Sequence, residues 1–277
     1  MSATRSAPVF AINHMVTPAL RPQAFFQLAR AIGVQDVEIR NDLTGNAIID
    51  GTPAADIRAQ AAEVGVKIAT INALQRFNEW TPGREKEAIE LADYARDAGA
   101  AALVLVPVND GTGQEDGARQ ANLRAALTAL KPILEARGLL GFVEPLGFEI
   151  CSLRSKREAV EAIEDIGGQD TFRIVHDTFH HHLAGEPALF PQWTGLVHIS
   201  GVTDAAIAIS DMRDSHRVLV DVQDRLGNIA QIRALLAGGY TGLFSFEPFA
   251  EEVQRLDDPA EAITVSMTAV RNGLAQS

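Results

Sequence analysis

Short apolar runs alternate with amphipathic segments along the whole chain. An uninterrupted apolar run is typical of a strand that is buried on both faces, as strands are in a parallel sheet. The segments between the runs carry apolar residues at helical spacing, for example Ala88, Leu91, Ala92 and Ala95. We therefore expect strands at 9–12, 37–39, 66–71, 101–106, 141–144, 172–177, 195–198 and 242–247.

Helices are expected between these strands, and local signals mark several of their ends. Thr52 is expected to cap a helix that has Pro53 at its first position and ends at Gly65, and Thr81 with Pro82 repeats the signal. The expected helices are 22–31, 53–65, a helix that begins at 82, a long helix through 123–134, then 156–166, 229–236 and 259–270, with only a short return segment at 183–193.

Regular alternation of strands and helices predicts parallel strands joined by right-handed crossovers. Eight such units in about 250 residues is the arrangement of a (β/α)8 TIM barrel in the α/β class, and we expect one barrel domain over residues 1–277. The alternative is a doubly wound open sheet. That fold usually carries a glycine-rich phosphate loop after the first strand, where this chain has Asn13-His14-Met15.

Composition narrows the choice of function classes. The net charge is −12, from 24 basic and 36 acidic residues, which argues against a nucleic-acid partner because such proteins usually carry a basic face. Cys151 is the single cysteine, so no intramolecular disulfide forms. The polar N-terminus lacks the apolar core of a signal peptide, and no run approaches the ~18 apolar residues of a membrane span. We expect a cytoplasmic protein that does not enter a membrane.

Four strands end in a charged or metal-ligating residue, which is an unusual place for one. These residues are Glu144, Asp177, His198 and Glu247, after the fifth, sixth, seventh and eighth expected strands. A buried charge is costly unless it is paired or binds a metal, and the active site of a TIM barrel lies at the C-terminal ends of its strands. We predict that the four side chains bind one divalent cation.

Three carboxylates and one imidazole form an oxygen-rich ligand set. It suits Mn²⁺, Mg²⁺ or Co²⁺, and Zn²⁺ is also compatible with it. Ligand type alone does not choose among them, and our prediction is Mn²⁺.

Each residue also has a structural interpretation when it is taken alone. Glu144 or Glu247 could pair with an arginine, Asp177 could cap the following turn, and His198 could be a hydrogen-bonded core histidine. Their equivalent positions in successive units favour the metal site. Of the neighbouring histidines, we expect His180 inside the site, and His181 and His182 outside it.

Four motifs resemble the xylose-isomerase-like TIM-barrel superfamily of sugar isomerases and epimerases, over the whole chain. They are Val143-Glu144-Pro145-Leu146-Gly147-Phe148, His176-Asp177-Thr178-Phe179-His180, Val197-His198-Ile199-Ser200 and Phe246-Glu247. Within this superfamily the chain most resembles the 2-keto-myo-inositol isomerase (inosose isomerase) family. Part of the second motif, Asp177-Thr178-Phe179-His180, carries that resemblance, together with two further stretches, Asp214-Ser215-His216-Arg217 and Asn72-Ala73-Leu74 with Phe77-Asn78.

The resemblance implies that Glu144, Asp177, His198 and Glu247 bind the metal, and that His180 and Arg217 contact the substrate. We add Asn72 and Trp80 as substrate-binding candidates, with Trp80 stacking on the apolar face of a ring. His14, Glu38, Arg40, Gln75 and Asn78 are softer candidates that rim or scaffold roles would also explain.

The chain also departs from the family patterns at two places. The family commonly has Gly-Glu-Gly soon after the loop arginine, where this chain has residues 218–224 without glycine, followed by Gly227. Ketose 3-epimerases usually carry a carboxylate at the position of Ile150, which counts against that activity.

The implied activity is carbonyl migration between neighbouring carbons of a keto-polyol, a step of inositol catabolism and carbohydrate metabolism. Glu144 and Glu247 would act as the acid/base pair, with His180 and Arg217 orienting substrate oxygens. One alternative is an epimerase, or a sugar or hydroxypyruvate-like isomerase, on the same metal. An apurinic-site endonuclease would need a basic groove and more histidine ligands, and a non-catalytic polyol-binding protein would have lost a ligand. The substrate would be a small polyol or keto-sugar, and a dimer or tetramer is left open.

Overall fold

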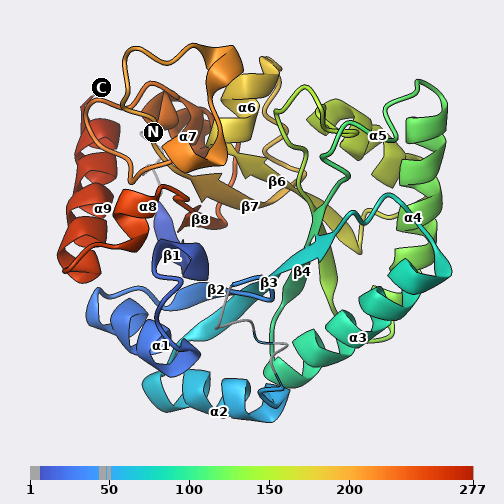
Figure 1. Ribbon diagram of the computed structural model, residues 1–277, viewed down its shortest axis with the longest axis horizontal. Helices are drawn as coiled ribbons and strands as arrows, with labels where there is room; N and C mark the ends of the chain where they lie inside the picture. The colour runs from blue at the N-terminus through green and yellow to red at the C-terminus, as the bar shows by residue number, and fades with distance from the viewer. Residues whose placement is uncertain (1–6, 44–47, 49–50, 277) are drawn as a thin grey trace, which may run out of the picture.

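A computed structural model describes residues 7–43, 48 and 51–276. Eight parallel strands close into a barrel in sequential order, with β1 paired to β8 (Figure 1). The strands are β1 Val9–Asn13, β2 Asp36–Arg40, β3 Lys67–Gln75, β4 Ala102–Val106, β5 Leu140–Val143, β6 Phe172–Asp177, β7 Thr194–Ile199 and β8 Leu243–Phe246. The predicted (β/α)8 barrel is confirmed.

The helices form a ring around the barrel (Figure 1). They are α1 Pro22–Ala31, α2 Ala54–Val64, α3 Pro82–Ala98, α4 Ala118–Glu135, α5 Lys156–Asp165, α6 Thr178–Ala184, α7 Asn228–Ala237, α8 Glu251–Gln254 and α9 Pro259–Ala275, with short 3-10 helices at His14–Val16, Ile209–Asp211 and Asp214–His216. Within the described ranges, none of these helices combines the length and the apolar character needed to span a bilayer.

Alternation along the strands divides the apolar residues between two packing regions. Outward side chains such as Leu103 and Val197 pack against the helices in the large core. Val104, Phe142, Val175 and Leu196 form a separate cluster. Because successive strand residues point to opposite faces, this second set lines the inside of the barrel. The inward positions nearer the C-terminal ends of the strands are polar.

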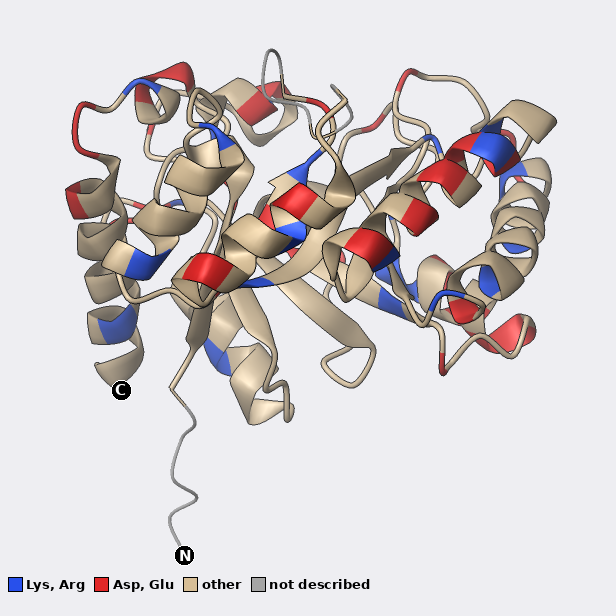
Figure 2. Ribbon diagram, turned by 90° about the horizontal axis from the view of Figure 1, so that it is seen from below, with Lys and Arg blue, Asp and Glu red and all other residues tan. Residues whose placement is uncertain are grey.

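Charged residues of both signs are interspersed along the outer helices (Figure 2). Arg119 with Glu158 and Arg124 with Asp165 join α4 to α5, and Arg137, just after α4, pairs with Asp93 of α3. On the side shown in Figure 2, the described part of the chain therefore presents no continuous basic face of the kind that nucleic-acid binding uses.

Three local expectations were wrong. Pro53, not Thr52, is the N-cap of α2, because its ψ of 137° is extended and the helix begins at Ala54. Strand β3 was expected to end at Ile71 but continues to Gln75, since its pairing with β4 resumes after a register shift between Asn72 and Leu74.

The third concerns the segment after β6, where we expected only a short return segment at 183–193. Helix α6 begins there at Thr178, because Asp177 is both the last strand residue and the helix N-cap.

The expected cap of α3 is confirmed, because Thr81 accepts a hydrogen bond from the backbone N–H of Arg84 and Pro82 opens the helix.

Candidate metal centre

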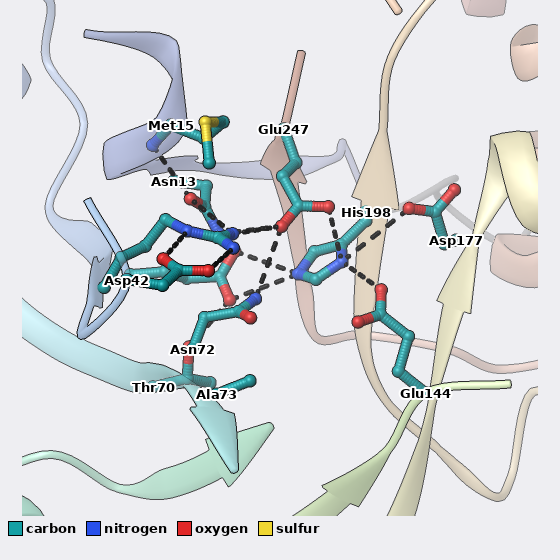
Figure 3. A network of polar contacts seen from close by, with 12 residues as sticks. Asn13, Met15, Asp42, Thr70, Asn72, Ala73, Glu144, Asp177, His198 and Glu247 are labelled. Atoms are coloured by element: carbon teal, nitrogen blue, oxygen red, sulfur yellow. Dashed lines mark hydrogen bonds and ion pairs between the residues drawn. The ribbon is translucent and has the colours of Figure 1, made fainter. Parts of the chain in front are cut away.

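Four side chains converge at the C-terminal end of the barrel (Figure 3). Glu144 directly follows β5, Asp177 ends β6, His198 lies in β7, and Glu247 directly follows β8. Each offers one ligand atom, and these atoms all lie within 4.8 Å of one another. All four residues are buried, with at most 4% of their surface exposed. Buried oxygen and nitrogen donors at this separation are arranged as a metal site requires.

Strand periodicity brings these side chains together. Glu144, Asp177 and His198 stand two residues after Phe142, Val175 and Leu196, which line the barrel interior. Because side-chain direction repeats every second residue, the three also point inward, one layer closer to the C-terminal end. The apolar cluster thus forms the floor of the site.

The imidazole of His198 is held at both ring nitrogens. Its Nδ1 lies 2.7 Å from Glu144 Oε1, 3.2 Å from Glu247 Oε2 and 3.8 Å from Asp177 Oδ2. Its Nε2 lies 3.1 Å from the carboxylate of Glu38, which also accepts a hydrogen bond from Thr70. Glu38 therefore fixes the ring so that Nδ1 is the nitrogen facing the other ligands.

Charge in this cluster shifts the pKa of the histidine. Burial disfavours the charged form of His198, but the negative charges of Glu247, Glu38 and Glu144 outweigh burial and raise its pKa well above the usual value. Burial likewise raises the pKa of Glu38, but His198 outweighs it, and the net effect is a lowered pKa.

Glu247 is held by a dense set of donors. Its Oε1 accepts hydrogen bonds from Arg40 at 2.9 Å, Asn13 at 3.2 Å and Asn72 at 3.3 Å, and its Oε2 accepts one from Arg217 at 3.1 Å. Burial alone would favour the neutral acid. The charges of His198, Arg217 and Arg40 outweigh burial and hold the pKa of Glu247 well below its usual range.

Glu144 has a poorer set of partners. Its side chain is paired with His198 Nδ1, and no guanidinium of the described residues lies within ion-pair distance of it. Burial is the largest influence and raises the pKa of Glu144, with His198 opposing it. The two glutamates of the site are therefore electrostatically unlike.

Asp177 caps the following helix, as one interpretation of its sequence position expected, and it also belongs to the cluster of ligand candidates. Its Oδ1 accepts hydrogen bonds from the backbone N–H groups of Phe179 and His180, which caps α6. Its Oδ2 belongs to the four-residue cluster and accepts from Arg217 Nη2 at 2.6 Å. The guanidinium of Arg217 also lies over the ring of Phe249, 4.6 Å from its centroid.

A cavity of about 390 Å³ opens beside the cluster. Glu144 and Glu247 line it together with three predicted substrate-binding residues, His180, Arg217 and Asn72. A larger cavity of about 640 Å³ adjoins it and shares Asn109, Phe148 and Asp214 with it.

Trp80, the fourth predicted substrate-binding residue, packs against the hydrophobic core and is not among the lining residues of this cavity. Of the softer candidates, Arg40 and Gln75 line the cavity, whereas His14 stacks on Phe25 and Asn78 hydrogen-bonds to Ser152. His181 and His182 do not line it either.

The sequence analysis assigned no role to Asn13, and it gave Glu38 and Arg40 only as candidates that a scaffold role would also explain. All three side chains contact His198 or Glu247 of the cluster. Glu38 and Arg40 are two residues apart on β2, and Asn13 pairs in register with Glu38. Polar residues at alternate positions near a strand end were the signal that could have identified an inward-facing polar layer.

Residues 26–271 match the model of the xylose isomerase-like TIM-barrel family, and the chain belongs to that family. A xylose isomerase domain containing protein (stm4435) from Salmonella typhimurium LT2 is 32% identical, covers 99% of this chain and 100% of its own, and superposes with a TM-score of 0.89. No protein of curated function matches the chain significantly.

Two more distant structures share the fold. The IolI protein with a bound zinc atom is 21% identical over 96% of this chain and 98% of its own, with a TM-score of 0.84. An L-ribulose 3-epimerase is 16% identical over 97% of this chain and 95% of its own, with a TM-score of 0.73.

Proposed function

We propose that this protein is a divalent-metal-dependent isomerase that moves a carbonyl group between neighbouring carbons of a keto-polyol of the inosose type. The observation that carries the proposal is the convergence of Glu144, Asp177, His198 and Glu247 within 4.8 Å beside a cavity of about 390 Å³. Two structures of the same fold, the IolI protein with bound zinc and an L-ribulose 3-epimerase, support metal-assisted sugar chemistry as the proposed activity.

The charges of the site fit a divalent cation. Four buried carboxylates, Glu38, Glu144, Asp177 and Glu247, face two buried guanidinium groups, those of Arg40 and Arg217. A histidine binds a metal in its neutral form, so a bound cation would displace the proton that the raised pKa of His198 favours in its absence. The site then carries a formal charge of −2, from −4 and +2, which one divalent cation would balance. Like charges at this separation repel unless they are neutralised.

The ligand atoms are three oxygens and one nitrogen, which suits Mn²⁺, and we propose Mn²⁺ as the native ion. Zn²⁺ is the alternative, because zinc is the ion in the IolI structure. Bound there, such an ion would act as a Lewis acid that stabilises negative charge on substrate oxygens. Elemental analysis of the purified protein, followed by activity with each ion, distinguishes the two.

The residues of the chain supply the proton transfer. Carbonyl migration needs a proton to leave the carbon next to the carbonyl and to return to the adjacent carbon. Glu144 and Glu247 would form the acid/base pair for these two steps, and the raised pKa of Glu144 supports it as the group that takes and returns a proton. His180, Arg217 and Asn72 line the cavity and would orient substrate oxygens.

The inosose substrate rests on the motifs around the cavity. In the motif Asp177-Thr178-Phe179-His180, Asp177 belongs to the cluster and His180 lines the cavity, as do Asp214 and Arg217 of the loop after β7. Asp214 and Arg217 are the first and last residues of the motif 214–217, and they form an ion pair at 3.1 Å. Asp214 therefore helps to hold the guanidinium of Arg217 at the cavity. Both motifs resemble those of inosose isomerases, and both lie at the cavity.

The test is solvent-deuterium exchange into a panel of inososes and linear ketoses, with and without added Mn²⁺. Metal-dependent label at the carbon next to the carbonyl of an inosose is the expected result. Label in linear ketoses alone would instead indicate a sugar or hydroxypyruvate-like isomerase or an epimerase. Absence of label in every candidate, with the metal shown to be bound, would refute isomerase activity on this substrate class.

A further inference from the structure

A second, much smaller cavity lies next to His180. Its volume is about 10 Å³, which is about the space that one water molecule needs, and its lining includes His180, Lys156, His181 and Asp177. His180 lines the larger cavity beside the cluster as well, so it borders both spaces. Only 5% of the residue is exposed.

One ring nitrogen of His180 is left without a hydrogen bond. Its Nδ1 is fully buried and has no partner among the described residues. A buried polar atom without a partner is costly, and a bound water is the usual way in which proteins satisfy one.

Lys156, which also lines the small cavity, is an oriented hydrogen-bond donor. Gln231 donates to the carbonyl oxygens of Thr178 and Leu226, which fixes the direction of its amide. Its Oε1 must then accept from His176 Nε2 at 2.8 Å, and this leaves His176 Nδ1 as an acceptor. Lys156 Nζ lies 3.2 Å from that nitrogen and donates to it.

Lys156 has one hydrogen to spare. An ammonium group carries three donors, and a second is directed at His181 Nδ1, 2.6 Å away. Burial lowers the pKa of Lys156 to about 8, with Glu186 opposing the shift, so the group remains largely protonated near neutral pH. The third donor has no acceptor among the described side chains.

We propose that the small cavity binds one water molecule, which accepts a hydrogen bond from Lys156 Nζ and donates one to His180 Nδ1. Two polar partners and about 10 Å³ are what a buried water requires. The water makes Nδ1 an acceptor and leaves the proton of the neutral ring on Nε2. His180 then presents an N–H donor to the substrate cavity, and Lys156 is a positioning residue for it. This last consequence rests on the proposed function, whereas the water site does not.

The first test reads the tautomer of His180 by ¹⁵N NMR in the full chain, without added metal and after loading with diamagnetic Zn²⁺. The chain has only 7 histidines, and loss of one signal set in His180→Ala assigns this residue. We expect the Nε2–H tautomer in the wild type and a shift toward a mixture in Lys156→Met. A wild-type Nδ1–H tautomer would overturn the proposal, even if Lys156→Met failed to fold. Unchanged signals in a folded Lys156→Met would overturn it too.

The second test measures turnover of an inosose that the exchange panel identifies. Lys156→Met should lower kcat about 10-fold with a smaller change in KM. The N–H of His180 would no longer be held toward the substrate, where it would stabilise the negative charge that develops in the transition state. The same substitution on a His180→Ala background should change kcat by less than about 2-fold, since no ring remains to be oriented. Lys86→Met, at an exposed lysine of α3 that pairs with Glu90, is the matched control.

Equal effects of Lys156→Met on both backgrounds would show a merely structural role and overturn the positioning. If no keto-polyol turns over, the proposed function fails, while the tautomer measurement still decides the water site.

Discussion

The two glutamates of the candidate site differ in how they are held. Glu247 has both carboxylate oxygens occupied by donors from Arg40, Asn13, Asn72 and Arg217. Glu144 is paired only with His198 in the described structure. A carboxylate fixed by several donors resists protonation, whereas one that is mainly desolvated accepts a proton more readily. In the proposed reaction, this difference would give the two residues unequal parts in moving a proton.

Replacing Glu247 by glutamine should leave the fold intact and reduce turnover by at least about 10³-fold, because it removes an acid/base group together with a ligand charge. Steady-state rates with the inosose, beside a circular dichroism spectrum, measure this. Glu251→Gln, at an exposed position in α8, is the control and should retain wild-type rates. Turnover within 10-fold of the wild type in Glu247→Gln would rule out the assigned role.

His14 supplies a pH dependence that is separate from the site. Its ring stacks on Phe25 and its Nε2 hydrogen-bonds to the carbonyl of Leu20. Burial lowers its pKa from 6.5 to about 4, Leu20 opposing and Arg40 adding to the shift. Between these values the unfolded chain binds more protons than the folded chain, so stability falls as the pH drops from 6.5 toward 4.

The full effect of that shift is about 3 kcal/mol. Urea unfolding at several pH values should show His14→Gln losing less stability than the wild type over this range. His216→Gln, in the loop after β7, serves as the comparison and should follow the wild type. Identical pH profiles for His14→Gln and the wild type would contradict the assignment.

At the scale of strands and helices, the four ligand candidates were predictable because each is the polar end of an apolar run. The residues that hydrogen-bond to these candidates were not predicted, because closure of the barrel brings them together from distant parts of the chain. Asn13 and Glu247 are hydrogen-bonded although 234 positions separate them. The predicted barrel places β1 beside β8, but nothing near Asn13 in the sequence indicates the register that brings it to Glu247.

The sequence did not predict helix α6, because the signal for the end of β6 and the signal for the start of α6 fall on the same residue. Asp177 is at once a strand residue, a helix cap and a ligand candidate, so β6 passes into α6 without a loop. A sequence pattern assigns such a residue to one element, whereas the backbone uses it in two. The roles of Glu144, Glu247 and the substrate-binding residues remain predictions that only activity measurements test.

The contact between the loop after β5 and α6 gives a prediction at this scale. A Cβ at Gly147 would clash with the carbonyl oxygen of His180 and would lie 2.6 Å from Leu183 Cβ. Gly147→Ala should therefore push α6 away and cost about 1–3 kcal/mol in urea unfolding, with reduced turnover because His180 moves. Gly83→Ala, whose Cβ would meet nothing closer than 3.7 Å in α3, is the matched control. A Gly147→Ala protein as stable and active as the wild type would show that this packing is not required.

Across the whole molecule, the barrel interior is divided into an apolar floor and a charged upper layer. The layer joins β1, β2 and β3 to β8 through Arg40, Asn13 and Asn72, which all bond to Glu247. The carboxylates there exceed the guanidinium groups, so closing the barrel concentrates negative charge at one point. A cation bound at that point should therefore stabilise the closed barrel as a whole.

Metal removal tests that coupling. A ligand that binds only the folded state adds RT ln(1 + [L]/Kd), which is about 2.7 kcal/mol at a hundredfold excess over Kd. For a chain of this size, that corresponds to a rise in melting temperature of roughly 5–10 °C. Dialysis against a chelator should lower the melting temperature by this amount and abolish turnover, and Mn²⁺ should restore both.

In Asp177→Asn the added ion should give a much smaller shift, because a ligand charge is lost while the amide oxygen can still accept the cap hydrogen bonds of α6. A melting temperature insensitive to chelation and to added Mn²⁺ or Zn²⁺, in protein whose elemental analysis shows no bound ion, would contradict the proposed metal site.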